Sequence, residues 1–118
     1  MISTTLYGIP NCDTVKKARR WLDEAGIAYQ FHDFRRDGLS ADWLADCLQR
    51  CPIDQFVNRR STSWRQLDDT QRQQAEHIDT LIPLLQANPT LIKRPVLQHA
   101  DHLHTGFDAP SYQEIFQK

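Results

Sequence analysis

The segment YGIPNCDTVKK, residues 7–17, contains the strongest signals for the fold and for a functional residue. It places Cys12 between an apolar, strand-like run and an amphipathic, helix-like run. Backbone N–H groups at a helix N-terminus point outward, and the helix dipole is positive there. Such a position favours thiolate over thiol and lowers a cysteine pKa, and Lys16 and Lys17 add positive charge. We therefore expect Cys12 to be a nucleophile and the most acidic of the three cysteines.

The alternative for Cys12 is a small buried side chain that only packs, because free cysteine is among the most buried residue types. The Gly-x-Pro-x-Cys loop that begins at Gly8 favours the functional interpretation.

Two strands and a helix are predicted around this loop. Residues 2–7 are rich in β-branched and aromatic side chains, which is typical of a short strand. A helix capped by Asp13 or Thr14 is expected to run to about residue 25 and end at Gly26. Residues 27–34 indicate a second strand. This βαβ unit predicts a parallel strand pair with a right-handed crossover.

The middle of the chain, about 39–88, is predicted to be an all-helical insertion. Ser40 caps a first helix, and either Asp68 or Asp69 caps a longer one that reaches about Leu85. The inner face of this longer helix is assigned to Ala75, Ile78, Ile82 and Leu85. Pro83 should kink it or open a second helical piece.

Strand patterns resume after the insertion. Residues 91–97 are apolar, and Pro95 within them argues for an edge, a bend or a cis bond. A turn at Ala100-Asp101 should join this strand to a partner at 102–107, and a short helix starting at residue 110 or 111 follows. The element order predicts a thioredoxin-like α/β fold with a mixed four-stranded sheet: one domain, residues 1–118, with its core at about 1–36 and 89–118.

Composition narrows the class of protein. The net charge of −1 argues against non-specific nucleic-acid binding, and no apolar run is long enough to span a membrane. The first residues lack the basic and apolar regions of a signal peptide. An odd number of cysteines fits a reducing cytoplasm better than a disulfide scaffold, so we expect a cytoplasmic protein.

Two clusters invite a metal-site interpretation, and neither is preferred. Cys47 and Cys51 are four residues apart on one helix, too few ligands for zinc and poorly placed for a disulfide. We expect Cys47 in the core and Cys51 near a helix end. His99, His102 and His104 surround a predicted hairpin turn that we expect to be solvated. No metal site is predicted.

Three motifs resemble one family. They are LYGIPNCDTVKKA at 6–18, NRRSTSWRQL at 58–67 and LIKRPVL at 91–97, and together they extend over nearly the whole chain. In this order they resemble the arsenate-reductase-like family of thioredoxin-fold proteins, most of all its YffB-like branch. That family also includes arsenate reductases coupled to glutathione and glutaredoxin, and the Spx-type transcriptional regulators.

The resemblance implies a set of site residues. The family's nucleophilic cysteine matches Cys12, its first oxyanion-binding arginine matches Arg59, and its second matches Arg94, which precedes the proline that the fold holds in cis. The glutathione-binding residues that we expect are Asn11, Arg59, Arg94 and Pro95, with Lys16 and Arg60 as auxiliary residues. The family's third arginine is missing, because residues 105–108 read TGFD.

The expected function is glutathione-dependent thiol–disulfide exchange at Cys12. Val15 stands where redox pairs carry their second cysteine, so Cys12 must be resolved by an outside thiol, and glutathione is the abundant one. The expected partners are glutathione as cosubstrate and glutaredoxin or a protein disulfide; no tightly bound cofactor is expected, and the protein is expected to be a monomer. The alternatives are an arsenate reductase, disfavoured by the missing arginine, and a non-catalytic Spx-like adaptor, whose usual Cys-x-x-Cys switch Val15 removes.

Overall fold

The structure is a computed structural model that describes residues 3–117. It contains two compact units, which we call the thioredoxin-like unit (up to Asp37 and from Arg94 onward) and the helical unit (Gly38–Lys93). The thioredoxin-like unit contains β1 (Thr4–Gly8), α1 (Asp13–Glu24), β2 (Gln30–Asp33), β3 (Val96–His99), β4 (His102–Thr105) and α7 (Ala109–Phe116). The helical unit contains α2 (Ala41–Arg50), α3 (Ile53–Phe56), α4 (Thr62–Arg65), α5 (Asp69–Gln74), α6 (Ile78–Ala87) and the 3₁₀-helix η1 (Pro89–Leu91).

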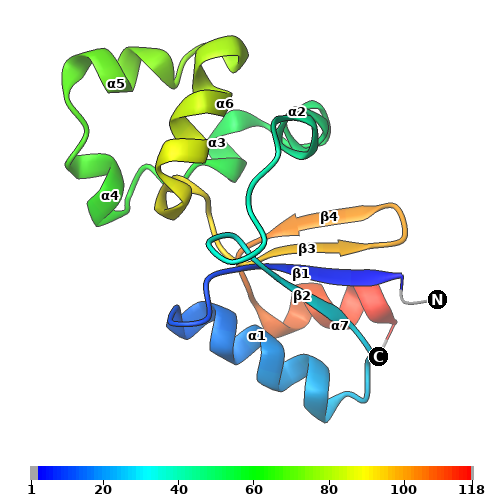
Figure 1. The fold of residues 1–118 in the computed structure, drawn as a ribbon. Helices are drawn as coiled ribbons and strands as arrows, with labels where there is room; N and C mark the ends of the chain where they lie inside the picture. The colour runs from blue at the N-terminus through cyan, green and yellow to red at the C-terminus, as the bar shows by residue number, and fades with distance from the viewer. Residues whose placement is uncertain (1–2, 118) are drawn as a thin grey trace. The chain divides into compact units, whose positions relative to one another are not determined.

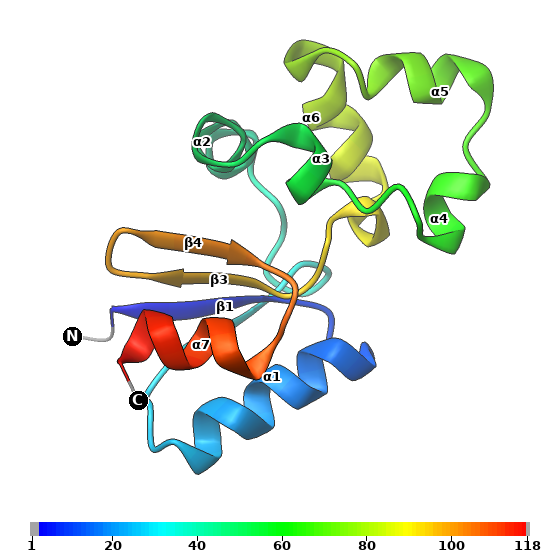
Figure 2. The ribbon, with the colours of Figure 1, turned by 180° about the vertical axis from the view of Figure 1, so that it is seen from behind.

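The thioredoxin-like unit is built on a mixed four-stranded sheet in the order β2-β1-β3-β4. β1 pairs in parallel with β2 and antiparallel with β3, and β3 forms an antiparallel hairpin with β4. Helices α1 and α7 lie on the same face of this sheet (Figures 1 and 2). The predicted thioredoxin-like α/β fold is confirmed.

The core of this unit lies between the sheet and its two helices. Leu6 and Leu97 are register partners on β1 and β3, so their side chains share the helix-covered face. Ala18 and Leu22, four residues apart on α1, pack against them together with Tyr112 of α7, and all five residues are fully buried. Burial of a large apolar side chain stabilises the fold by about 1.5–3 kcal/mol, so this cluster fixes α1 against β1.

Helix α1 begins one or two residues earlier than expected. Its N-cap is Cys12 in an extended conformation, with no side-chain capping bond, so the assignment of the cap to Asp13 or Thr14 is wrong. At the other end, Gly26 adopts φ +72 and ends the helix as predicted. Hydrogen bonds from Gly26 to Asp23 and from Ile27 to Leu22 complete a Schellman motif. Residues 27–29 therefore connect α1 to β2, and β2 begins only at Gln30.

The long helix predicted in the helical unit is two helices. Asp68 caps α5 with a full capping box, but the helix stops at Gln74 and α6 starts after His77. The break shifts the helical phase, so Ile78, assigned to the inner face, is 39% exposed while Leu81 is fully buried. Pro83 lies inside α6 and is not the break point.

The C-terminal part agrees better with expectation. The Arg94–Pro95 bond is cis, which confirms that prediction. The strand predicted from residue 91 begins only at Val96, because Leu91 belongs to η1 and Ile92 forms an isolated bridge with Val57. Helix α7 is capped by Asp108 and so starts at Ala109, before the predicted residue.

Candidate functional site

Cys12 is half-buried at the junction of the β1–α1 loop and the first turn of α1. Its backbone N–H donates to the Ile9 carbonyl at 3.1 Å, and its own carbonyl accepts from the Lys16 N–H at 3.0 Å. The sulfur atom is thus attached at the start of a helix whose first-turn N–H groups lack intrahelical acceptors. Asn11, next to Cys12, and Lys16, on the first turns of α1, are exposed.

The proline loop lies at the same end of the sheet as the cysteine loop. β1 and β3 are antiparallel, and Tyr7, near the end of β1, is the register partner of Val96, the first residue of β3. The residues that follow β1 and those that precede β3 therefore emerge at the same end of the sheet. Asn11 and Cys12 accordingly leave the sheet at the end at which Arg94 and Pro95 enter it.

Arg94 has an unused hydrogen-bond donor. Its Nε atom is buried and has no hydrogen-bond partner within residues 3–117. Pro95 next to it is buried, and its carbonyl accepts from the Gly106 N–H at 2.9 Å. This bond ties the loop to Gly106, the residue that follows β4. An unsatisfied guanidinium donor at this end of the sheet is suited to an anionic or carbonyl-bearing ligand.

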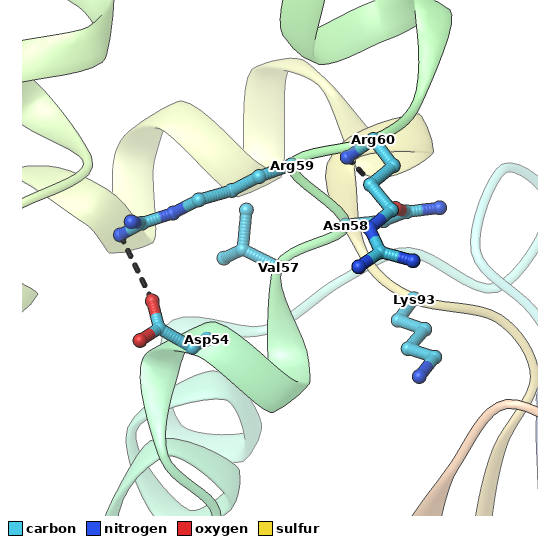
Figure 3. A pocket seen from close by; sticks show the side chains of 6 residues that line it. All are labelled: Asp54, Val57, Asn58, Arg59, Arg60 and Lys93. Atoms are coloured by element: carbon cyan, nitrogen blue, oxygen red, sulfur yellow. Dashed lines mark hydrogen bonds and ion pairs between the residues drawn. The ribbon is translucent and has the colours of Figure 1, made fainter.

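The other predicted basic residues belong to the helical unit. A pocket of about 530 Å³ is lined by Asp54, Val57, Asn58, Arg59, Arg60 and Lys93 (Figure 3). Arg59 lies on one side with its Nη2 atom 3.2 Å from Asp54 Oδ1, and its guanidinium carbon is 5.4 Å from the ring centre of Trp64. Asn58, Arg60 and Lys93 are drawn on the other side in this view.

The predicted site residues are therefore divided between the units. Cys12 and Arg94 share the thioredoxin-like unit, whereas Arg59 belongs to the helical unit, and its approach to Cys12 stays a prediction. Lys93 and Asp54 were missed at the sequence level. Lys93 could have been noticed because it directly precedes Arg94 within the LIKRPVL motif.

The two other cysteines have environments unsuited to nucleophiles. Cys47 is fully buried, and this burial raises the pKa of its thiol to about 12, with a further rise from nearby Asp46. Cys51 follows the end of α2 and is 8% exposed, and burial raises its thiol pKa as well. These positions confirm the expected placement of Cys47 in the core and Cys51 at a helix end.

The histidines of the β3–β4 hairpin have separate environments. His99 is hydrogen-bonded to the Thr4 hydroxyl at 2.7 Å, and His104 lies 3.7 Å from Asp108. His102 is exposed. Across the described part of the chain, no group of three or more His, Cys, Asp or Glu side chains could hold a metal ion. No helix of residues 3–117 has both the length and the apolar character needed to cross a bilayer.

Comparison with known proteins identifies similar sequences over most of the chain. The ArsC family model matches residues 7–115. An uncharacterized protein of Haemophilus influenzae is 42% identical over 112 residues, which cover 95% of this chain and 97% of that protein. The global transcriptional regulator Spx of Listeria innocua is 31% identical over 110 residues, covering 88% of this chain and 79% of the regulator.

Solved structures are similar as well. The YffB (PA3664) protein superimposes with a TM-score of 0.86 at 38% identity, covering 94% of this chain and 96% of that one. An arsenate reductase (ArsC) related protein from Brucella melitensis has a TM-score of 0.75 at 40% identity, with 98% and 96% covered. An arsenate reductase from Vibrio cholerae shares the fold, with a TM-score of 0.71 at 17% identity over 98% of this chain and 97% of that one.

Proposed function

The chain belongs to the ArsC family, and from that premise we propose that it is a thiol–disulfide oxidoreductase that uses glutathione as cosubstrate and Cys12 as nucleophile. The observation that carries this proposal is the position of Cys12. Cys12 is half-buried and is the N-cap of α1. It lies at the end of the sheet at which the Arg94–Pro95 loop also lies. The thiolate is the form of a cysteine that attacks disulfides.

The reaction proceeds in two exchanges. The Cys12 thiolate attacks the glutathione sulfur of a mixed disulfide, forms a Cys12–glutathione disulfide and releases the other thiol, which takes up a proton. The thiolate of a second glutathione then attacks the glutathione sulfur bound to Cys12. This step forms oxidised glutathione and regenerates the Cys12 thiolate. The net change is reduction of one mixed disulfide to a free thiol, with one glutathione consumed.

The need for an outside thiol follows from the other cysteines. Val15 occupies the position one turn after Cys12 and is fully buried, so no second thiol stands there. Cys47 and Cys51 belong to the helical unit, are buried and have raised pKa values, which makes them poor resolving groups. Glutathione, supplied freely or through glutaredoxin, is the resolving thiol in this proposal, and a glutathionylated protein or small disulfide is the substrate.

Arsenate reduction is the first rival activity, suggested by the family. A tetrahedral oxyanion with more than one negative charge is best bound by several bidentate donors. At the position of the family's third arginine this chain has residues 105–108, where Phe107 packs edge-on against Tyr112 at 4.8 Å between ring centres. That position therefore provides an apolar packing contact and no cation.

Regulation of transcription is the second rival, because the Listeria protein of 31% identity is a global transcriptional regulator. In that case Cys12 would have no turnover, and the chain would act by docking on a protein.

The experiment that separates these functions is a glutathione-coupled assay offered either a small glutathione mixed disulfide or arsenate. The proposal expects turnover of the mixed disulfide that is abolished in Cys12→Ser, and little turnover of arsenate. Efficient arsenate turnover would replace it by the first rival. Inactivity on both substrates would favour the second.

A further inference from the structure

Helix α1 carries cations beside the proposed nucleophile. A surface pocket of about 460 Å³ lies along this helix and is lined by Pro10, Lys16, Arg19, Arg20, Asp23 and Glu24. All of these residues belong to the thioredoxin-like unit, which also contains Cys12. Within residues 3–117 none of the three cations of this pocket forms an ion pair. Their charges are therefore available to an anionic partner.

The three cations lie on the same side of α1 as Cys12. Cys12 is the N-cap, and Lys16 and Arg20 follow it at intervals of four residues, with Arg19 next to Arg20. Residues four apart on an α-helix lie one above the other on one face. A helix rises by 1.5 Å per residue, so Arg20 lies about 12 Å from Cys12 along the axis. Lys16, Arg19 and Arg20 thus form a cationic stripe that begins one turn after Cys12.

The middle member of the cationic stripe is held in a fixed position. Arg19 is half-buried, and its Nε donates to the Tyr29 hydroxyl at 3.2 Å. Its guanidinium carbon lies 4.3 Å from the ring centre of Phe31. A guanidinium has five N–H donors, and both contacts leave its charge unneutralised. Arg19 is therefore an ordered cation, whereas Lys16 and Arg20 are exposed.

The acidic residues of the pocket lie at the end of α1 that is remote from Cys12. Asp23 and Glu24 are the last two residues of the helix, and both are exposed. The other acid of α1, Asp13, precedes Lys17 by one turn, and neither of these two residues lines the pocket. Like charges repel, so a negatively charged partner fits the cationic stripe near Cys12 and is disfavoured beyond it.

We infer that the cationic stripe docks an acidic segment of a protein substrate whose cysteine carries the glutathione disulfide that Cys12 attacks. The inference rests on the proposed function and names its substrate class: proteins glutathionylated at a cysteine flanked by acidic residues. An extended chain advances about 3.3 Å per residue, so the acidic residues should lie within about four positions of that cysteine. Cys12 bonds to the glutathione sulfur, and the substrate leaves as a thiolate that takes up a proton.

The test compares two synthetic peptides, each with a single glutathionylated cysteine. One has glutamates on both sides of the cysteine, and the other has glutamines in their place. The ratio of their kcat/KM values, the acidic preference, is measured for the whole protein as wild type, Lys16→Gln, Arg20→Gln and the double variant. Because both peptides carry the same glutathione, this ratio is insensitive to changes in glutathione binding or in Cys12 reactivity.

The matched control is Lys17→Gln, because Lys17 is an exposed lysine of the same helix that does not line the pocket. An exposed ion pair changes an equilibrium by up to about fivefold. We therefore expect an acidic preference of about tenfold in the wild type and about twofold or less in the double variant. Lys17→Gln should keep the wild-type preference. Salt at about 1 M should abolish it, because the Debye length falls to about 3 Å.

Docking is also measured without reaction. Peptides with serine in place of the cysteine are added to the wild type, and backbone amide NMR shifts are recorded. We expect the acidic peptide to shift the amides of the cationic stripe, and the glutamine peptide to leave them unchanged. Lys16 and Arg20 are exposed, so circular dichroism of their variants should show an unchanged fold.

Three results overturn the inference: equal kcat/KM for the two peptides, an acidic preference that survives in the double variant, or an equal loss in Lys17→Gln. Turnover of both peptides without a preference leaves the proposed function standing. Shifts along the cationic stripe without turnover of either peptide support docking and refute the proposed function. The absence of both turnover and shifts refutes both.

Discussion

Gly8 at the end of β1 lies directly against Val15 in the first turns of α1. A Cβ atom placed on Gly8 would be 2.8 Å from Val15 Cγ2, closer than real Cβ contacts. Val15 is fully buried, so its branched side chain has little room to move. The absence of a side chain at Gly8 therefore lets the loop that carries Cys12 run close to the helix that follows it.

We predict that Gly8→Ala destabilises the protein by about 1–3 kcal/mol through overpacking. Denaturant unfolding measures this change. Gly8→Ala combined with Val15→Ala should be less destabilised than the sum of the two single variants, because the contact atom is gone. Simple additivity would show that the close contact does not limit the position.

From the burial of the Cys47 thiol we predict that the free energy of unfolding falls at alkaline pH. Its thiol keeps its proton in the folded state, where burial raises the pKa to about 12, whereas the unfolded value is about 8.5. Above pH 8.5 the unfolded state binds fewer protons than the folded state, so the free energy of unfolding falls as pH rises toward 12. Unfolding of the wild type and Cys47→Ala between pH 8.5 and 10 tests this, with a shallower decline expected for the variant. Parallel pH profiles would count against it.

The Tyr112 hydroxyl is buried and lacks a hydrogen-bond partner in the described residues, and burial raises its pKa. Its ring packs edge-on against Trp21 and Phe107, contacts that phenylalanine would keep. Leaving a buried hydroxyl unpaired costs about 1–3 kcal/mol, so we predict that Tyr112→Phe is neutral or stabilising. A fall in thermal midpoint of several degrees in Tyr112→Phe would show that the hydroxyl is satisfied in solution.

Arg94→Ala should lose turnover while the protein stays folded. The buried Nε of Arg94 has no partner within residues 3–117, so its removal breaks no internal hydrogen bond of that atom. A lost charged hydrogen bond to glutathione should weaken binding about tenfold or more. Steady-state kinetics with a glutathione mixed disulfide, together with thermal unfolding, separate the two effects. Arg35→Ala, which removes an exposed arginine of the same unit, serves as the control and should behave as wild type.

Local signals predicted most of the thioredoxin-like unit because sequence-local chemistry sets its boundaries. Gly26 ends α1 through its positive φ, as predicted, whereas the Asp108 cap that starts α7 at Ala109 was not predicted. The helix boundaries of the helical unit were harder to predict. Ala75 and Ile78 fit one continuous apolar face, but the chain leaves the helix between them, and periodicity alone does not reveal a short break.

The candidate site could be predicted only in part. A cysteine after Gly-x-Pro is recognisable in sequence, and so is the Arg94–Pro95 pair. The engagement of Arg59 by Asp54 could not be predicted, because it depends on how α3 and the following turn are folded. The same holds for Lys93. It lines the same pocket as Arg60 only because the Val57–Ile92 bridge pairs two segments that are far apart in the sequence.

The central claim is that Cys12 is the thiol that reacts with glutathione. Intact mass after incubation of the native protein with oxidised glutathione tests it most directly, with Cys12→Ser beside it and peptide mapping to locate the adduct. We predict one glutathione per chain, located on Cys12, removed by added glutathione and absent from Cys12→Ser. An adduct on Cys47 or Cys51, or an unmodified Cys12 under the same conditions, would contradict the account.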